Sequence, residues 1–196
     1  VILDFVRQYG ASIVGERMIP FLMMIVGFFP ISVSLVIALE SFVGEKERGS
    51  IEPLLNTPLK DWQLYAGKLL SSTVPPLVSS FLGMGVYAAG LAFQSVPLPE
   101  LELIVLIVVL TVVQAFVMVS GAVVVSTQAT SVRAANLLAS FIIIPMALLI
   151  QGESVIMFWG DYRSLWLIIL GLLALTFLFT RVGLAHGAET VTTAEP

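Results

Sequence analysis

The fold is decided by an island of charge that reads Gly44-Glu45-Lys46-Glu47-Arg48-Gly49-Ser50-Ile51-Glu52-Pro53-Leu54-Leu55-Asn56-Thr57-Pro58-Leu59-Lys60 and continues through Asp61 and Trp62 to Gly67-Lys68. Only 11% of the residues in this chain are charged, so this concentration of charge marks a segment that lies in water. Uncharged, mostly apolar runs flank it at 18–39 and 69–99. The pattern predicts two membrane spans joined by an aqueous segment, residues 41–68, which we call the elbow.

The composition of the whole chain is that of a membrane protein. Hydrophobic residues make up 58% of the 196 residues, and the mean hydropathy is +1.04, whereas soluble domains are about 45–50% apolar. The absence of cysteine excludes disulfides and thiolate metal sites. A net charge of -4 gives no reason to expect a nucleic-acid partner. The expected surroundings are therefore the lipid bilayer and other proteins.

Five uncharged runs approach or reach the length that crosses a bilayer. They cover residues 18–39, 69–99, 103–132, 134–152 and 164–180. A helix needs about 20 apolar residues to cross the hydrocarbon core, and the runs lack the alternation of apolar and polar residues that barrel strands show. The sequence therefore predicts an all-α, polytopic helical membrane protein. Its five transmembrane helices are expected at about 19–40, 66–92, 103–127, 134–150 and 164–181.

Basic residues are unevenly distributed between the two sides of these spans. One side holds Lys46, Arg48, Lys60, Lys68, Arg133 and Arg181, and the other holds Arg7, Arg17 and Arg163. Because Lys and Arg are enriched in cytoplasmic loops, we expect the elbow and the C-terminus in the cytoplasm and Val1 outside. The chain is then a multi-pass protein of the cell (plasma) membrane.

This orientation divides the chain into three regions. Residues 1–17 are expected to be the remnant of an external loop, residues 18–184 the transmembrane domain that contains the elbow, and residues 185–196 a disordered cytoplasmic tail, because that tail is small and polar. An external N-terminus followed by five spans suggests that one more helix precedes them in the full-length protein, which would then have six.

Local signals predict a rigid structure for the elbow. Gly49 can end the helix that leaves the membrane, and Ser50 can cap a short helix that has Glu52 in its first turn. Thr57 and Pro58 form a second helix start, with Thr as the cap and Pro at the first helical position. Such an elbow suits the transfer of force from a soluble partner to two membrane helices. The same residues also fit an ordinary solvated loop.

The order of residue types in the elbow resembles a known family. The run Gly-Glu-Lys-Glu-Arg-Gly-Ser-Ile-Glu-x-Leu-Leu-x-Thr-Pro from Gly44, followed by Gly67-Lys68, is similar to the permease subunits of ABC-2 type transporters. The resemblance implies a prokaryotic exporter in which two permeases, identical or different, flank one pathway with an ABC ATPase subunit under each. It also implies that the elbow docks on the ATPase. The ATPase-coupling positions would be Glu45, Arg48, Gly49, Glu52, Thr57, Pro58 and Lys68.

The predicted spans carry no Asp, Glu, Lys, Arg or His well inside the membrane, and Glu153 falls in the predicted loop between the fourth and fifth spans. Polar side chains remain, and Gln114 and Ser32 are candidates for lining a pathway or for bonding a neighbouring helix. An interior without ionisable groups favours an apolar or amphipathic cargo over a small ion.

The sequence offers no catalytic, cofactor-binding or metal-binding residues. Gly67-Lys68 is followed by Leu69 and lacks the first glycine of a phosphate-binding loop, so ATP and Mg are expected on a partner subunit. The sequence thus favours a permease subunit of an ATP-driven exporter that is not itself an enzyme. A membrane scaffold or assembly protein that transports nothing, and a membrane-embedded enzyme, are the alternatives.

Overall fold

The computed structural model describes Gly10 and residues 17–48, 61–129 and 131–192. All regular secondary structure in these residues is helical. The elements are α2 (Ile19–Phe28), η2 (Phe29–Ile31), α3 (Ser32–Leu39), η3 (Glu40–Gly44), α4 (Glu45–Glu47), α6 (Asp61–Phe93), α7 (Leu101–Gln128), α8 (Val132–Trp159) and α9 (Tyr162–Thr192). The predicted all-α class is confirmed.

Five helical stretches are long and apolar enough to cross a membrane, as the sequence predicts. They are Ile19–Gly44, Ala66–Phe93, Leu101–Ser126, Val132–Trp159 and Tyr162–Val182. The fourth span differs most from its prediction, because it runs on past residue 150 to Trp159. Gly160 ends it, with a φ of 80° and an N–H that bonds back to the Ile156 and Met157 carbonyls. Glycine takes this left-handed conformation at little cost, so the helix stops there and not at Glu153.

The first span is a helix with two changes of winding. Pro30 lies in the tighter three-residue turn η2, which is expected because proline has no N–H to donate and its ring crowds the preceding turn. Farther along, η3 is a short stretch of wider π-helix from Glu40 to Gly44. Such π segments are rare and often occur at functional sites. The first span therefore changes its winding just before it reaches the charged residues of α4.

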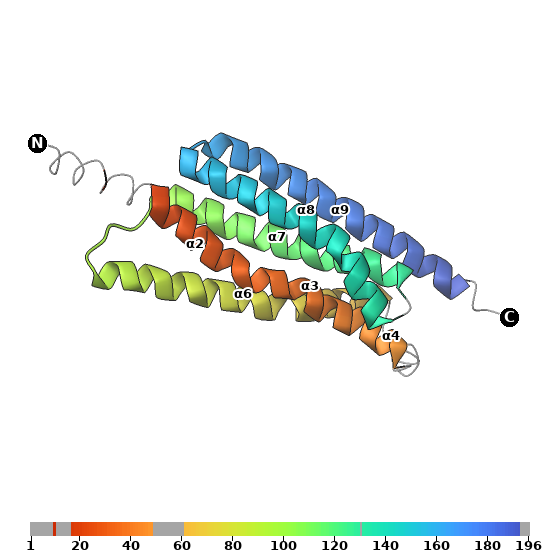
Figure 1. Ribbon diagram of the computed structural model, residues 1–196. Coiled ribbons are helices and arrows are strands. Elements are labelled where there is room, and N and C mark those ends of the chain that lie inside the picture. Colours follow the sequence, from red (N-terminus) through yellow and green to blue (C-terminus); the bar gives the residue numbers. More distant parts are fainter. Residues whose placement is uncertain (1–9, 11–16, 49–60, 130, 193–196) are drawn as a thin grey trace, which may run out of the picture.

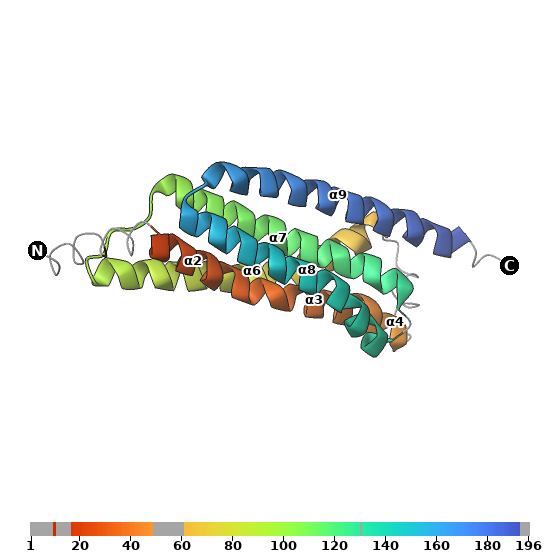
Figure 2. The same ribbon diagram turned by 45° about the horizontal axis from the view of Figure 1, so that its top comes forward.

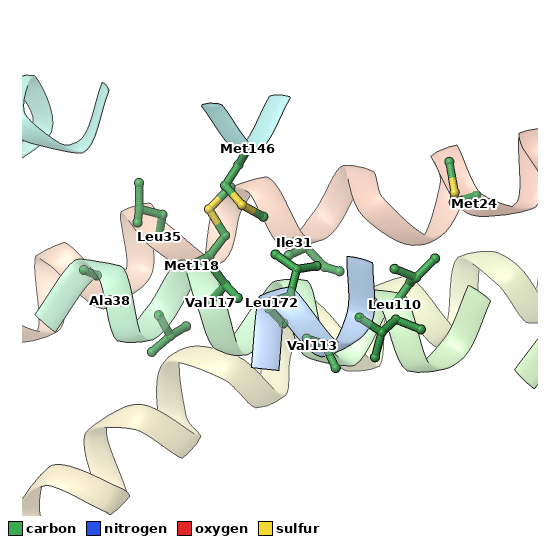
Figure 3. Close-up of a cluster of buried hydrophobic side chains, with 14 of the residues drawn as sticks. Met24, Ile31, Leu35, Ala38, Leu110, Val113, Val117, Met118, Met146 and Leu172 are labelled. Atoms are coloured by element: carbon green, nitrogen blue, oxygen red, sulfur yellow. The ribbon is translucent and has the colours of Figure 1, made fainter. Parts of the chain in front are cut away.

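The spans form an antiparallel bundle with α7 at its centre (Figures 1 and 2). Along their apolar stretches, 67% of α7 residues are buried within the chain, against 17% for α6 and for α9. α7 packs against α2, α3, α6, α8 and α9. The outer faces of α6 and α9 are left for lipid or for a partner. Figure 3 shows the core, in which Met24, Ile31 and Leu35 of the first span meet Leu110, Val113, Val117 and Met118 of α7, Met146 of α8 and Leu172 of α9.

Small residues allow α7 to lie close to its neighbours. A Cβ added at Gly121 would come within 2.9 Å of Ile142 Cδ1 on α8 and 3.4 Å of the Phe179 ring on α9. Near the other end, a Cβ on Gly27 of α2 would come within 3.0 Å of Thr111 Oγ1 on α7. In lipid, helices associate through such close packing, because the surrounding acyl chains are as apolar as the side chains themselves.

The two ends of the bundle differ in what they carry. α4, the start of α8 and the C-terminal end of α9 lie at one end, and the α6–α7 and α8–α9 connections lie at the other (Figure 1). We call the first the elbow end. Lys68, Arg133 and Arg181 belong to the segments nearest this end. Their distribution agrees with the bias in basic residues from which the sequence predicts a cytoplasmic elbow.

The C-terminal region differs from its prediction. α9 continues to Thr192, so residues 185–192 are helical where the sequence predicts a disordered tail over 185–196. A helix that is already nucleated extends easily through good helix formers such as Ala185 and Ala188. Residues 193–196 lie outside the described part of the chain, as does the predicted external loop 1–17 apart from Gly10 and Arg17.

Candidate functional site

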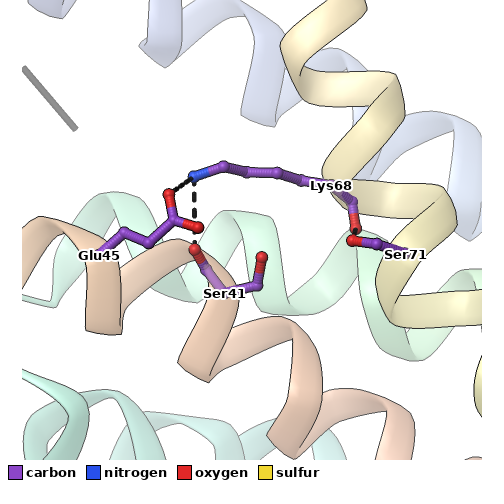
Figure 4. Close-up of polar contacts among 4 residues, drawn as sticks. All are labelled: Ser41, Glu45, Lys68 and Ser71. Atoms are coloured by element: carbon purple, nitrogen blue, oxygen red, sulfur yellow. Dashed lines mark hydrogen bonds and ion pairs between the residues drawn. The ribbon is translucent and has the colours of Figure 1, made fainter. Parts of the chain in front are cut away.

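The end of the first span is joined to the second by a charged contact. Lys68 reaches from α6 to Glu45 of α4, with 2.5 Å between Lys68 Nζ and Glu45 Oε2 (Figure 4). The same ammonium donates to the Ser41 carbonyl at 3.3 Å and lies 5.5 Å from the centre of the Phe42 ring. The side chains of Lys68 and Glu45 are only 14% and 32% exposed. Partial burial makes this pair stronger than an ordinary surface ion pair.

A second ion pair joins the last part of the first span to Arg48, the residue that follows α4. Arg48 Nη2 is 2.5 Å from Glu40 Oε1, but both side chains are largely exposed, at 72% and 49%. The Glu40 carboxylate lies against Gly44, where an added Cβ would come within 3.0 Å of it. An exposed pair of this kind contributes about 0–1 kcal/mol. It brings Arg48 back toward the π segment η3, but it does not reach another span.

A third contact joins α4 to the start of α8. Glu47 Oε2 accepts a hydrogen bond of 2.8 Å from the Val132 backbone N–H, the first residue of α8. The first N–H groups of a helix have no partner within it, and a carboxylate there also interacts favourably with the helix dipole. Ser131 caps the same helix by accepting from the Ala134 N–H at 3.2 Å. Glu47 thus attaches the end of the first span to α8.

The structure describes three of the seven positions predicted to couple to an ATPase, and it brings two of them, Glu45 and Lys68, into contact. Glu45, Arg48 and Lys68 lie at the elbow end in the contacts above. The other four, Gly49, Glu52, Thr57 and Pro58, lie outside the described residues. Sequence reasoning missed Glu47, whose partner is 85 positions away along the chain. The position of Glu47 within the charged island does not indicate a contact with so distant a residue.

Inside the bundle, Gln114 of α7 contacts Glu153 of α8. Gln114 Nε2 donates to Glu153 Oε2 at 2.5 Å, and the two residues are only 2% and 0% exposed. The second carboxyl oxygen, Oε1, is buried and has no hydrogen-bond partner among the described residues. This corrects two expectations, because Glu153 lies within a span and not in an external loop, and the interior of the spans does contain an ionisable group. The reason is that α8 continues to Trp159, so Glu153 lies inside the helix and is buried within the bundle.

Gln114 and Ser32 therefore have different surroundings. Gln114 bonds a neighbouring helix, which is one of the two roles that the sequence allows it. Ser32 donates to the Phe29 carbonyl of its own helix at 2.7 Å and is partly exposed on the first span. Its hydroxyl satisfies a carbonyl beside the Pro30 turn. That contact is local to the first span and joins no second helix.

A comparison with protein families identifies the chain. A family model described as "ABC-2 family transporter protein" matches residues 5–194. No curated protein and no solved structure matches the chain. The match covers nearly the whole sequence, so the chain belongs to the ABC-2 transporter family and is a permease component of an ABC transporter.

Proposed function

We propose that this ABC-2 family chain is the permease subunit of an ATP-driven exporter and that its elbow receives movement from a separate ATPase subunit. The observation that carries the proposal is the set of contacts at the elbow end. Glu45 contacts Lys68 at the start of the second span, and Glu47 contacts Val132 at the start of the fourth. A displacement of the elbow would therefore be transmitted to the first, second and fourth spans.

The proposed division of labour places nucleotide chemistry on the partner. ATP and Mg would bind the ATPase subunit, and the elbow would dock on that subunit through Glu45, Arg48, Gly49, Glu52, Thr57, Pro58 and Lys68. Two permeases, from one gene or from two, would flank the pathway. Binding and hydrolysis of ATP would move the elbows, and the bundles would alternate between inward and outward arrangements.

Co-purification tests this assignment. The tagged chain, extracted from its native membranes in mild detergent, is expected to bring down an ABC ATPase, and native mass spectrometry should give two permeases with two ATPase subunits. ATP hydrolysis should appear in the complex and be absent from the chain alone. Glu52→Lys in the elbow should weaken the association, whereas Glu100→Lys, the same charge change at the other end of the bundle, should not.

Three results would count against this assignment. Recovery of a monomer without any ATPase would favour a scaffold protein over a transporter. Equal loss of the ATPase in Glu52→Lys and Glu100→Lys would remove the elbow as the docking surface. Hydrolysis by the chain alone would place the catalytic site on this subunit and contradict the division of labour.

The sidedness of the membrane can be tested separately. The chain has no cysteine, so single introduced thiols report cleanly. Gln94 is exposed and directly follows α6, opposite the elbow end. In intact cells, Gln94→Cys is expected to react with an impermeant maleimide, whereas Ser50→Cys should react only after the cells are permeabilised. The reverse pattern would place the elbow outside and exclude its docking on a cytoplasmic ATPase.

A further inference from the structure

The pair formed by Gln114 and Glu153 is the most unusual polar group within the spans. Glu153 lies roughly 9 Å before the end of α8 at Trp159, at about 1.5 Å per residue, and none of its surface is exposed. Ionisable residues are rare inside membrane spans and usually mark a functional site. The permease mechanism proposed above does not use this pair.

The surroundings of Glu153 determine which ligand it can hold. Gln114 donates to one carboxyl oxygen, and the other is buried without a partner in the described part of the chain. A buried carboxylate is tolerated only with a compensating cation or after neutralisation. The amide of Gln114 is uncharged and cannot supply that compensation. The free oxygen, fully enclosed, can instead carry a hydrogen atom.

Charged and titratable groups near this end of the bundle lie just before α2, at the start of α7 and at the α8–α9 turn. Arg17, just before α2, donates to the Phe158 carbonyl at 3.0 Å. Glu100 and Glu102 lie at the start of α7 and are exposed. At the α8–α9 turn, Asp161 accepts a hydrogen bond from Ser164, and Tyr162 and Arg163 follow it. None of the ion pairs found among the described residues involves Glu153.

We propose that Glu153 and Gln114 form an intramembrane site for a proton. In the arrangement described here the proton is on the Glu153 carboxyl, and the Gln114 amide holds that carboxyl between α7 and α8. When the spans move apart and water reaches the site, the carboxyl releases the proton to that water and becomes a carboxylate. It takes a proton back from water as the spans close. Switching of the bundle would then be linked to uptake and release of one proton per chain.

Infrared spectroscopy of the purified chain in lipid nanodiscs tests the site without any ATPase. A neutral carboxylic acid has a carbonyl stretch that is well separated from carboxylate bands and moves in D₂O. The wild-type chain at neutral pH is expected to show this band, Glu153→Gln to lose it, and Glu102→Gln to keep it. In Gln114→Leu the band should shift to higher frequency, because the carbonyl loses its hydrogen-bond donor.

Each outcome decides the proposal. A wild-type spectrum without the band, or a band that remains unchanged in Glu153→Gln, would mean that Glu153 is ionised or that the signal comes from another residue, and either would overturn the proton site. If Glu153→Gln does not fold, Gln114→Leu serves alone, and a band that does not shift would overturn the proposal equally. The measurement uses no nucleotide, so failure of the ATPase assignment and failure of the proton site remain distinguishable.

Discussion

Reversal of the charge at Lys68 is expected to give the largest functional loss of any single change at the elbow end. Lys68→Glu would place two carboxylates together where Lys68 and Glu45 are now 2.5 Å apart. A hydrogen bond to a charged group is worth about 1.5–3 kcal/mol, and about 1.4 kcal/mol corresponds to a factor of ten. The permease–ATPase complex in proteoliposomes should therefore lose about tenfold to a hundredfold of its transport-linked ATP hydrolysis.

Two further variants separate this contact from a general effect of charge. The double variant Glu45→Lys with Lys68→Glu exchanges the partners and should recover most of the activity. Arg133→Glu makes the same change of charge on an exposed side chain at the start of α8, and it should keep activity close to that of the wild type. Similar losses in Lys68→Glu and Arg133→Glu, or no recovery in the exchanged pair, would show that the Glu45–Lys68 contact does not carry the coupling.

Loss of Gln114 is expected to give the largest effect on stability. Gln114→Leu removes the donor to Glu153 and leaves both oxygens of a fully buried carboxyl without a partner among the described residues. Unsatisfied buried polar groups cost about 1–3 kcal/mol each. Glu153→Leu should cost a similar amount by leaving the Gln114 amide unpaired. The double variant should be more stable than the sum of the two changes predicts, because no polar group is then left alone.

Reversible unfolding in mixed micelles measures these differences, with Thr111→Val as the matched control. The Thr111 hydroxyl is buried on α7 like Gln114, but it bonds the Ile107 carbonyl of its own helix at 2.7 Å. Its removal should cost less than removal of the contact between helices. If the two single changes simply add in the double variant, Gln114 and Glu153 do not stabilise one another, and the hydrogen bond between them contributes little.

The buried carboxyl also bears on the cargo that the spans could accept. An interior without ionisable groups would favour an apolar or amphipathic substrate over a small ion. Glu153 is enclosed between the helices, so the interior of this chain contains an ionisable group and does not favour an apolar cargo over a small ion. With a proton site at Glu153, the free-energy difference between the two arrangements of the bundle would depend on pH. The relevant pH is that on the side of the membrane from which water reaches α8.

Much of the fold follows from the sequence alone. The five spans are set by the lengths of the uncharged runs, because backbone polar groups in hydrocarbon must be bonded within a helix. The elbow is marked by charges that lipid does not accommodate. The basic side chains of Lys68, Arg133 and Arg181 are distributed as expected for elements that meet at one end of the bundle. These features depend on local composition, which can be read without knowledge of which helices are neighbours.

The contacts between spans were decided only by the tertiary structure. Gln114 and Glu153 are 39 positions apart, and Glu47 and Val132 are 85 positions apart. Whether a carboxyl faces lipid, water or another helix depends on the packing around α7 and on where α8 ends. The run of uncharged residues stops before Glu153, but the helix continues until Gly160 can adopt its left-handed conformation. Local composition determines what can enter the membrane, whereas the partners of each polar group depend on distant parts of the chain that packing brings together.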